Sequence, residues 1–155
     1  VGEMLDRFTY EDALENPPIF TLLGDTLSRI AAGEHAWVAV RYYEVHLLAH
    51  LGFQPRLFEC ANCGETIQAV AQFFSPGAGG VLCPRCGAGL PGATPVTVEA
   101  LKYLRHLQRS AYPQARRADP APAVRAEMEA LLQRYITYLL ERELNSPGFI
   151  RQINS

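Results

Sequence analysis

The sequence lacks the features of membrane and exported proteins. It has no signal-peptide pattern and no apolar run near the 20 or so residues that cross a bilayer. Charged residues make up 19% of the chain and hydrophobic residues 48%, a balance typical of globular proteins. We therefore predict a cytoplasmic protein with no membrane partner, whose length suits one domain or a modest helical domain with a small insert.

The sequence also lacks the common catalytic motifs. It contains no GxSxG nucleophile elbow and no GxxxxGK[ST] or GxGxxG phosphate loop. His46 and His50 have the spacing that binds zinc in HExxH proteases, but Leu47 stands where those proteases carry the catalytic Glu. We interpret the pair as histidines of a helical bundle. No acid, base and nucleophile are brought together, so we predict that the protein is not an enzyme.

The four cysteines of the chain all lie in one stretch. They form two CxxC pairs separated by 19 residues: Cys60, Cys63, Cys83 and Cys86. This spacing is typical of a site in which four thiolates surround one zinc ion at about 2.3 Å. Because four thiolates leave no position for water or substrate, we predict one structural Zn²⁺. Two disulfides, a redox-active CxxC and a catalytic cysteine are the alternatives.

The pattern around the cysteines predicts a mainly α protein, a helical bundle with an inserted four-cysteine zinc ribbon or knuckle. Residues 72–74 and 81–82 have the composition of short strands joined by a Gly/Pro-rich turn. Apolar periodicity and helix-capping residues predict five helices and a linker at 87–95. The helices are expected at residues 4–14, 19–31, 36–51, 97–111 and 122–144, with a basic loop at 113–120 and a C-terminal segment, Phe149 and Ile150, folded back on the bundle. We divide the chain into a helical segment (1–56), the ribbon (57–90) and the helices that complete the bundle (91–155).

The charge of the chain is unevenly distributed. The net charge of −2 argues against a protein that is basic all over, yet residues 102–117 contain five basic residues and no acidic one. Helical spacing puts three of them on one face, where they can meet phosphates together. The candidate DNA-binding residues are Arg85, Lys102, Arg105, Arg109, Arg116 and Arg117. An ordinary solvated helix face explains the same charges equally well.

Two stretches beside the cysteines resemble a known family. Residues 51–55 (LGFQP) precede the first CxxC, and residues 74–80 (FSPGAGG) lead to the second, as in the RecO family of bacterial DNA repair proteins. The resemblance implies zinc binding by the four cysteines and a recombination mediator of the RecF pathway, associated with the nucleoid. Such proteins bind single- and double-stranded DNA, anneal complementary strands, pair with RecR and help to load RecA onto DNA coated by single-stranded DNA-binding protein.

One departure from the family bears on the expected activity. Family members begin with an OB-fold that binds DNA, and no barrel-like sequence precedes Val1, so we expect a C-terminal fragment with reduced DNA affinity. The competing hypothesis is a zinc-ribbon adaptor that does not bind DNA and captures proteins through Phe73, Phe74 and Phe149. A zinc-dependent hydrolase would need an open metal site, which four thiolates do not leave.

Overall fold

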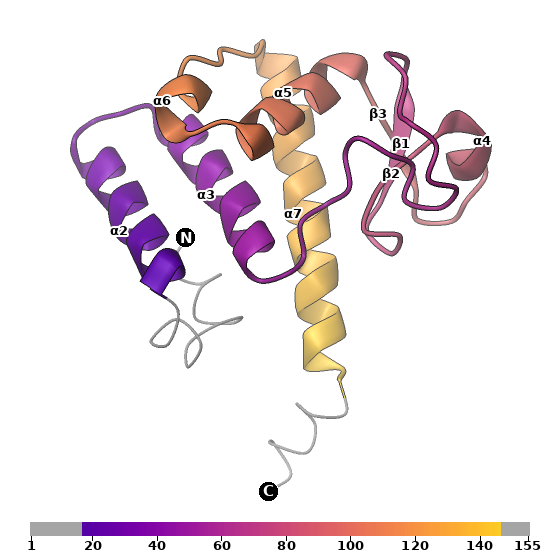
Figure 1. Cartoon of the computed structure of the whole chain (residues 1–155), viewed down its shortest axis with the longest axis horizontal. Coiled ribbons are helices and arrows are strands. Elements are labelled where there is room, and N and C mark those ends of the chain that lie inside the picture. Colours follow the sequence, from indigo (N-terminus) through magenta and orange to yellow (C-terminus); the bar gives the residue numbers. More distant parts are fainter. Residues whose placement is uncertain (1–16, 147–155) are drawn as a thin grey trace, which may run out of the picture.

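The computed structural model describes residues 17–146, which form helices beside a small sheet (Figure 1). The predicted mainly α fold with a cysteine-bearing insert is confirmed. The predicted helix at 4–14 and the docking of Phe149 and Ile150 lie outside the described residues. Across residues 17–146, none of the helices combines the length and apolar character of a membrane span.

The two helices before the cysteines form one side of the bundle. Helix α2 (Pro17–Ala31) begins with two prolines, which a first helical turn tolerates, and packs on α3 (Ala36–His50). Helix α3 is buried on nearly all faces, as its sequence predicts. Two residues after its last residue, Gly52 has a φ of +85°, which lets the Phe53 N–H donate to the Leu48 carbonyl at 2.8 Å. The chain is thereby turned toward the cysteines.

The helices after the cysteines complete the same core. Helix α5 (Val98–Arg109) starts at Thr97, whose Oγ1 accepts a hydrogen bond from the Ala100 N–H at 3.2 Å. It packs on α3 and on α7 (Pro122–Leu144), whose bounds agree with the prediction. The predicted basic loop after α5 is partly wrong, because the one-turn helix α6 (Tyr112–Ala115) occupies its start. Pro113 suits the first turn of a helix, so it starts α6 rather than only ending α5.

A three-stranded antiparallel sheet carries the cysteine segment. Strands β1 (Gln72–Ser75) and β2 (Gly80–Leu82) are the predicted hairpin, and the order is β2-β1-β3. Strand β3 (Thr94–Val96) and the one-turn helix α4 (Pro84–Gly87) were not predicted; β3 lies partly in the expected linker and beyond residue 90. The segment boundaries therefore stay a prediction.

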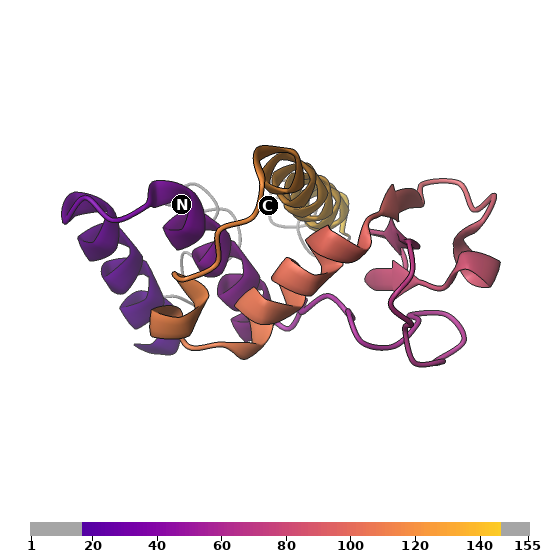
Figure 2. The same cartoon turned by 90° about the horizontal axis from the view of Figure 1, so that it is seen from above.

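The sheet is joined to the bundle through its central strand. Phe74 of β1 is 1% exposed, and its ring meets that of Tyr135 on α7 edge to face, with centroids 5.6 Å apart. Seen from above, α2 and the sheet lie at opposite ends of the molecule, with α5 and α7 between them (Figure 2). Helix α5 is thus placed beside the cysteine segment.

Candidate metal centre and basic groove

The four cysteine sulfurs gather at one point. All four lie within 4.8 Å of one another, and the Sγ atoms of Cys63 and Cys83 are 3.9 Å apart. Sulfurs bonded tetrahedrally to a zinc-sized ion at about 2.3 Å stand roughly 3.8 Å from each other. All four are free thiols, so the two-disulfide alternative does not apply to this structure. The cluster has the donors and the dimensions to hold one metal ion.

Tight backbone turns bring the two CxxC pairs together. The Gly64 N–H donates to the Cys60 carbonyl, and the Gly87 N–H donates to the Cys83 carbonyl, both at 2.9 Å. Gly64 has a φ of +79°, a conformation that glycine adopts readily. The first turn is fixed to the hairpin because the Ala61 N–H donates to the Val81 carbonyl at 2.8 Å. The hairpin therefore sets the separation of the two pairs.

Hydrogen bonds prepare the sulfurs for negative charge. The Cys83 N–H and the Asn62 side-chain amide donate to the sulfurs of Cys60 and Cys86, each at 3.4 Å. Burial raises the pKa of Cys60, but backbone N–H groups, those of Cys63 and Cys83 foremost, outweigh it and lower the pKa to about 6. The backbone N–H of Cys86 lowers the pKa of Cys83, whereas burial and the neighbouring sulfurs raise it to about 11. Cys60 therefore ionises more readily than Cys83, and a cation among the sulfurs would favour the thiolate form.

Arg85 lies on the cysteine segment, away from the other candidate DNA contacts. Its side chain is exposed and forms an ion pair with Glu65 at 3.1 Å. This pair joins the second CxxC to the residues after the first. An exposed ion pair contributes little stability, but it partly neutralises the charge that Arg85 offers to a ligand.

Four of the six candidate basic residues line one cavity of about 1010 Å³. It opens between α5, the segment 58–70 and the segment 114–119, and we name it the α5 groove. The basic residues that line it are Lys102, Arg105, Arg109 and Arg117. Among the described lining residues Asp119 is the only acidic one, and its carboxylate accepts a hydrogen bond from Arg125 at 2.7 Å. Arg116 is exposed on the surface beside the groove and is not among its lining residues.

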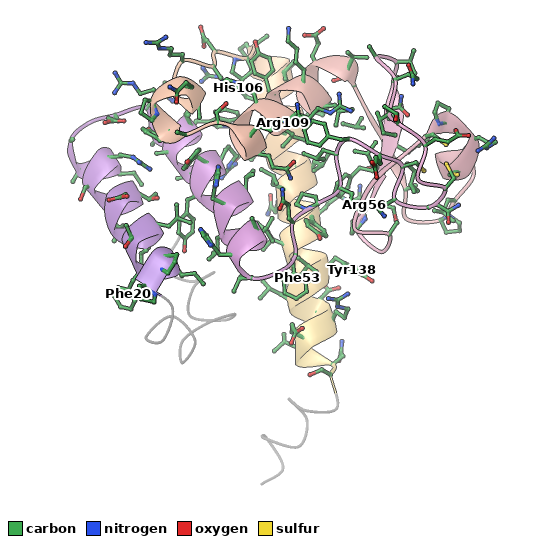
Figure 3. The ribbon with its side chains drawn as sticks, in the orientation of Figure 1. Phe20, Phe53, Arg56, His106, Arg109 and Tyr138 are labelled. Carbon is green, nitrogen blue, oxygen red and sulfur yellow. The ribbon has the colours of Figure 1, made fainter. Side chains whose placement is uncertain are left out.

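Arg105 and Arg109 differ in their surroundings. Arg105 is partly buried, and its Nε donates to the Leu57 carbonyl at 2.8 Å; burial, with Arg109 nearby, lowers its pKa. Arg109 is exposed, and its guanidinium carbon lies 3.5 Å from the ring centroid of Phe58. Figure 3 shows Arg109 and His106 on α5, and Arg56 on the segment that enters the cysteine region. Arg105 therefore connects α5 to that segment, whereas Arg109 is available to a ligand.

Sequence reasoning missed two apolar residues, Phe58 and Val70, that line the groove. Phe58, Leu101 and Tyr103 line it, as does Val70, whose side chain is 51% exposed. Phe58 and Val70 belong to a stretch without helical or strand periodicity, so no pattern assigns them to a site.

The prediction that exposed phenylalanines form a protein-binding surface is partly wrong. Phe74 is buried in the core, and Phe73 is partly buried and packs against it. An added Cβ on Gly87 would meet Phe73, which shows how closely the second CxxC turn approaches β1. Phe149 lies outside the described residues.

The predicted bundle histidine His46 bonds through Nε2 to the Leu107 carbonyl at 2.8 Å, and His50 is exposed.

Comparison with known proteins places this geometry in context. Residues 1–147 match the family model described as "Recombination protein O C terminal". The chain is 39% identical over 152 residues to the "DNA repair protein RecO" of Roseiflexus sp. (strain RS-1), covering 98% of this chain and 53% of that protein. It is 36% identical to the protein of that name from Dehalococcoides mccartyi (strain BAV1) over 91% of this chain and 55% of the relative. For the Myxococcus xanthus protein of that name the identity is 33%, over 96% and 59%.

Two further facts define the extent of these similarities. The chain spans little more than half the length of these relatives. No solved structure matches it.

Proposed function

Because this chain belongs to the RecO family and matches its C-terminal region, we propose that it acts in DNA repair and homologous recombination as a zinc-stabilised, DNA-binding part of a recombination mediator. The observation that carries the proposal is the α5 groove, which is lined by four cations and one carboxylate and has the segment 58–70 as one of its walls. The proposed role is binding and the recruitment of partners, not catalysis.

Zinc is the metal that we propose for the four cysteines. Cys60, Cys63, Cys83 and Cys86 offer four soft donors at tetrahedral separation, and the amide of Asn62 supports one of them. When bound, the ion supplies a cross-link between the two turns. Apparent binding free energies of about 10–16 kcal/mol for structural zinc are comparable to the stability of a whole domain. The metal would thereby fix the segment 58–70, which forms one wall of the groove.

The groove is suited to neutralise DNA phosphates. Lys102, Arg109 and Arg117 are exposed cations on its lining, and release of the counterions that they displace drives association with a polyanion. Two strands held on such a surface repel each other less, which favours annealing. We assign Arg105 chiefly to the support of the groove, and Arg85 and Arg116 to weaker contacts outside it.

The roles that depend on other proteins follow the family. We propose RecR as the direct partner, with RecA loading and contact with single-stranded DNA-binding protein as activities of the assembled complex. Co-elution of zinc-loaded chain and RecR on a sizing column would support the partner assignment. Separate elution at concentrations of tens of micromolar would place the RecR contact elsewhere in the longer relatives.

Fluorescence anisotropy tests the DNA-binding proposal directly. Labelled single-stranded and duplex oligonucleotides are titrated with the zinc-loaded chain over a range of salt concentrations. Three phosphate contacts predict a slope of log K against log salt of roughly −2 to −3. The double variant Lys102→Glu/Arg109→Glu should bind far more weakly, while Arg142→Glu on α7, outside the groove, should bind as the wild type does. Absence of binding at low salt would refute the proposal.

A further inference from the structure

The α5 groove offers a hollow as well as a charged surface. A cavity of about 1010 Å³ is at the upper end of the 300–1,000 Å³ of typical small-ligand sites. Bases in a duplex are stacked inside the helix, so only the backbone of double-stranded DNA can reach a concave site. An unpaired base is free to enter it.

Part of the lining of the hollow is apolar. Phe58 and Val70 come from the cysteine segment, and Tyr103 on α5 adds a second ring, whereas Leu101 is 3% exposed and offers little surface. Val70 leaves 51% of its surface exposed, although the aliphatic side chains of the core are almost fully buried. Aromatic and apolar surface of this kind stabilises bases without selecting a sequence.

Arg109 is held against the ring of Phe58. Its guanidinium lies 3.5 Å from the centroid of Phe58, and Arg105 lies 4.9 Å from the same centroid. A guanidinium this close to a ring face loses rotamer freedom and holds its planar group near a fixed place. Bases stack on guanidinium planes as they do on aromatic rings. Exposed Arg109 is thus a stacking platform in advance of binding.

The charges of the groove suit a backbone that continues past the base. Lys102 and Arg109 are seven residues apart on α5, or about 10 Å along the helix axis, so they can meet different phosphates of one strand. Arg117 contributes a cation from the segment after α6. An acidic peptide would also neutralise these charges, but its carboxylate side chains carry no base that stacks on the Arg109 guanidinium.

We propose that the α5 groove is a binding site for single-stranded DNA in which an unpaired base stacks on Arg109, supported by Phe58, while Lys102 and Arg117 hold the adjacent phosphates. The inference rests on the proposed DNA-binding function and specifies its substrate. Duplex DNA would contact only the cations, so stacking is what distinguishes the two substrates.

The test is a substitution that keeps the positive charge of residue 109 and removes its planar guanidinium. Arg109→Lys is compared with Arg142→Lys, which alters a second arginine positioned over an aromatic ring, 5.3 Å from the centroid of Phe53 and outside the groove. Anisotropy is measured with a labelled oligothymidine and with a labelled duplex of equal length. Loss of one stacking contact predicts oligothymidine binding weaker by about fivefold or more in Arg109→Lys. Duplex binding is expected to change less than about twofold, and Arg142→Lys to match the wild type with both ligands.

Three other results would overturn the stacking site. Equal losses for both ligands, or none, would overturn the stacking site while leaving a DNA-binding surface in place. Failure of the wild-type chain to bind either ligand would overturn the proposed function as well. Displacement of oligothymidine by decaglutamate as effectively as by unlabelled oligothymidine of equal charge would identify a general anion site and also overturn the inference. Phe58→Leu, which keeps apolar volume but removes the ring, is expected to repeat the Arg109→Lys result.

Discussion

The Nε of Arg105 donates a hydrogen bond to the carbonyl of Leu57, 2.8 Å away and 48 residues earlier in the chain. The contact joins α5 to the segment that leads into the cysteines, and the nearby side-chain amide of Gln108 donates to the Pro55 carbonyl at 3.0 Å in the same way. A basic residue expected to contact DNA thus also fastens two parts of the fold together. The two roles have to be separated by experiment.

Substitution of Arg105 is expected to cost stability. Arg105→Ala leaves the Leu57 carbonyl without its charged donor, which corresponds to a loss of about 1–3 kcal/mol in the free energy of unfolding. Lys102→Ala, one turn earlier and exposed, should change it by less than about 0.5 kcal/mol. Urea unfolding followed by circular dichroism measures both. Equal stability of the two variants would show that the Arg105 contact is not structural.

Gly80 is expected to tolerate no side chain. A Cβ at this position would lie 2.8 Å from the backbone nitrogen of Arg56, with which Gly80 forms an isolated bridge. Gly80→Ala should therefore separate the hairpin from the incoming segment and destabilise the protein by about 1–3 kcal/mol. Gly77→Ala, in the same turn, is the control because its Cβ would meet nothing closer than 3.7 Å. Thermal unfolding of the zinc-loaded variants should give a lower melting temperature for Gly80→Ala than for Gly77→Ala. Equal melting temperatures would contradict the close approach of Gly80 to Arg56.

The local parts of this fold could be predicted from the sequence, and the parts made by distant contacts could not. Apolar periodicity and proline placement fixed α7, and the CxxC spacing identified the cluster. Strand β3 contains Pro95 and only three residues, so no period is visible in it. The α5 groove combines α5 with Phe58 and Val70 from an irregular segment, and its existence depends on tertiary packing. Helical spacing placed Arg105 and Arg109 together. It could not show that Arg105 is partly buried and bonded to Leu57, whereas Arg109 is exposed.

His46 is expected to make stability fall in mild acid. Burial lowers the pKa of His46 below its usual value of 6.5; the hydrogen bond to Leu107 opposes this shift and the charge of His50 adds to it. The unfolded chain therefore binds a proton at a higher pH than the folded one, so stability is lost as the pH falls from 6.5 through the folded pKa. His46→Gln should show a smaller decrease in melting temperature between pH 7 and pH 5 than the wild type.

The control for His46 is its exposed neighbour one turn later. Because burial is the main cause of the shift, His50→Gln should keep most of the wild-type pH dependence. Buried Glu44 also titrates in acid, with a pKa raised chiefly by burial, but it is common to all three proteins and cancels in the comparison. A pH profile in His46→Gln that superimposes on the wild-type profile would refute the assignment.

Asn62 is expected to strengthen metal binding without touching the metal. Its side-chain amide donates to the sulfur of Cys86 at 3.4 Å, across from its own CxxC. A donor to a thiolate stabilises the charged form that binds zinc, and loss of such supporting contacts typically weakens metal affinity by about 10–100-fold. Asn62→Ala should therefore release zinc to a chromophoric chelator at least about tenfold more readily. Gln68→Ala is the matched control, because the amide of Gln68 donates to the Thr66 carbonyl and to no sulfur. If both variants held zinc as the wild type does, backbone donors such as the Cys83 N–H would be sufficient to stabilise the four thiolates.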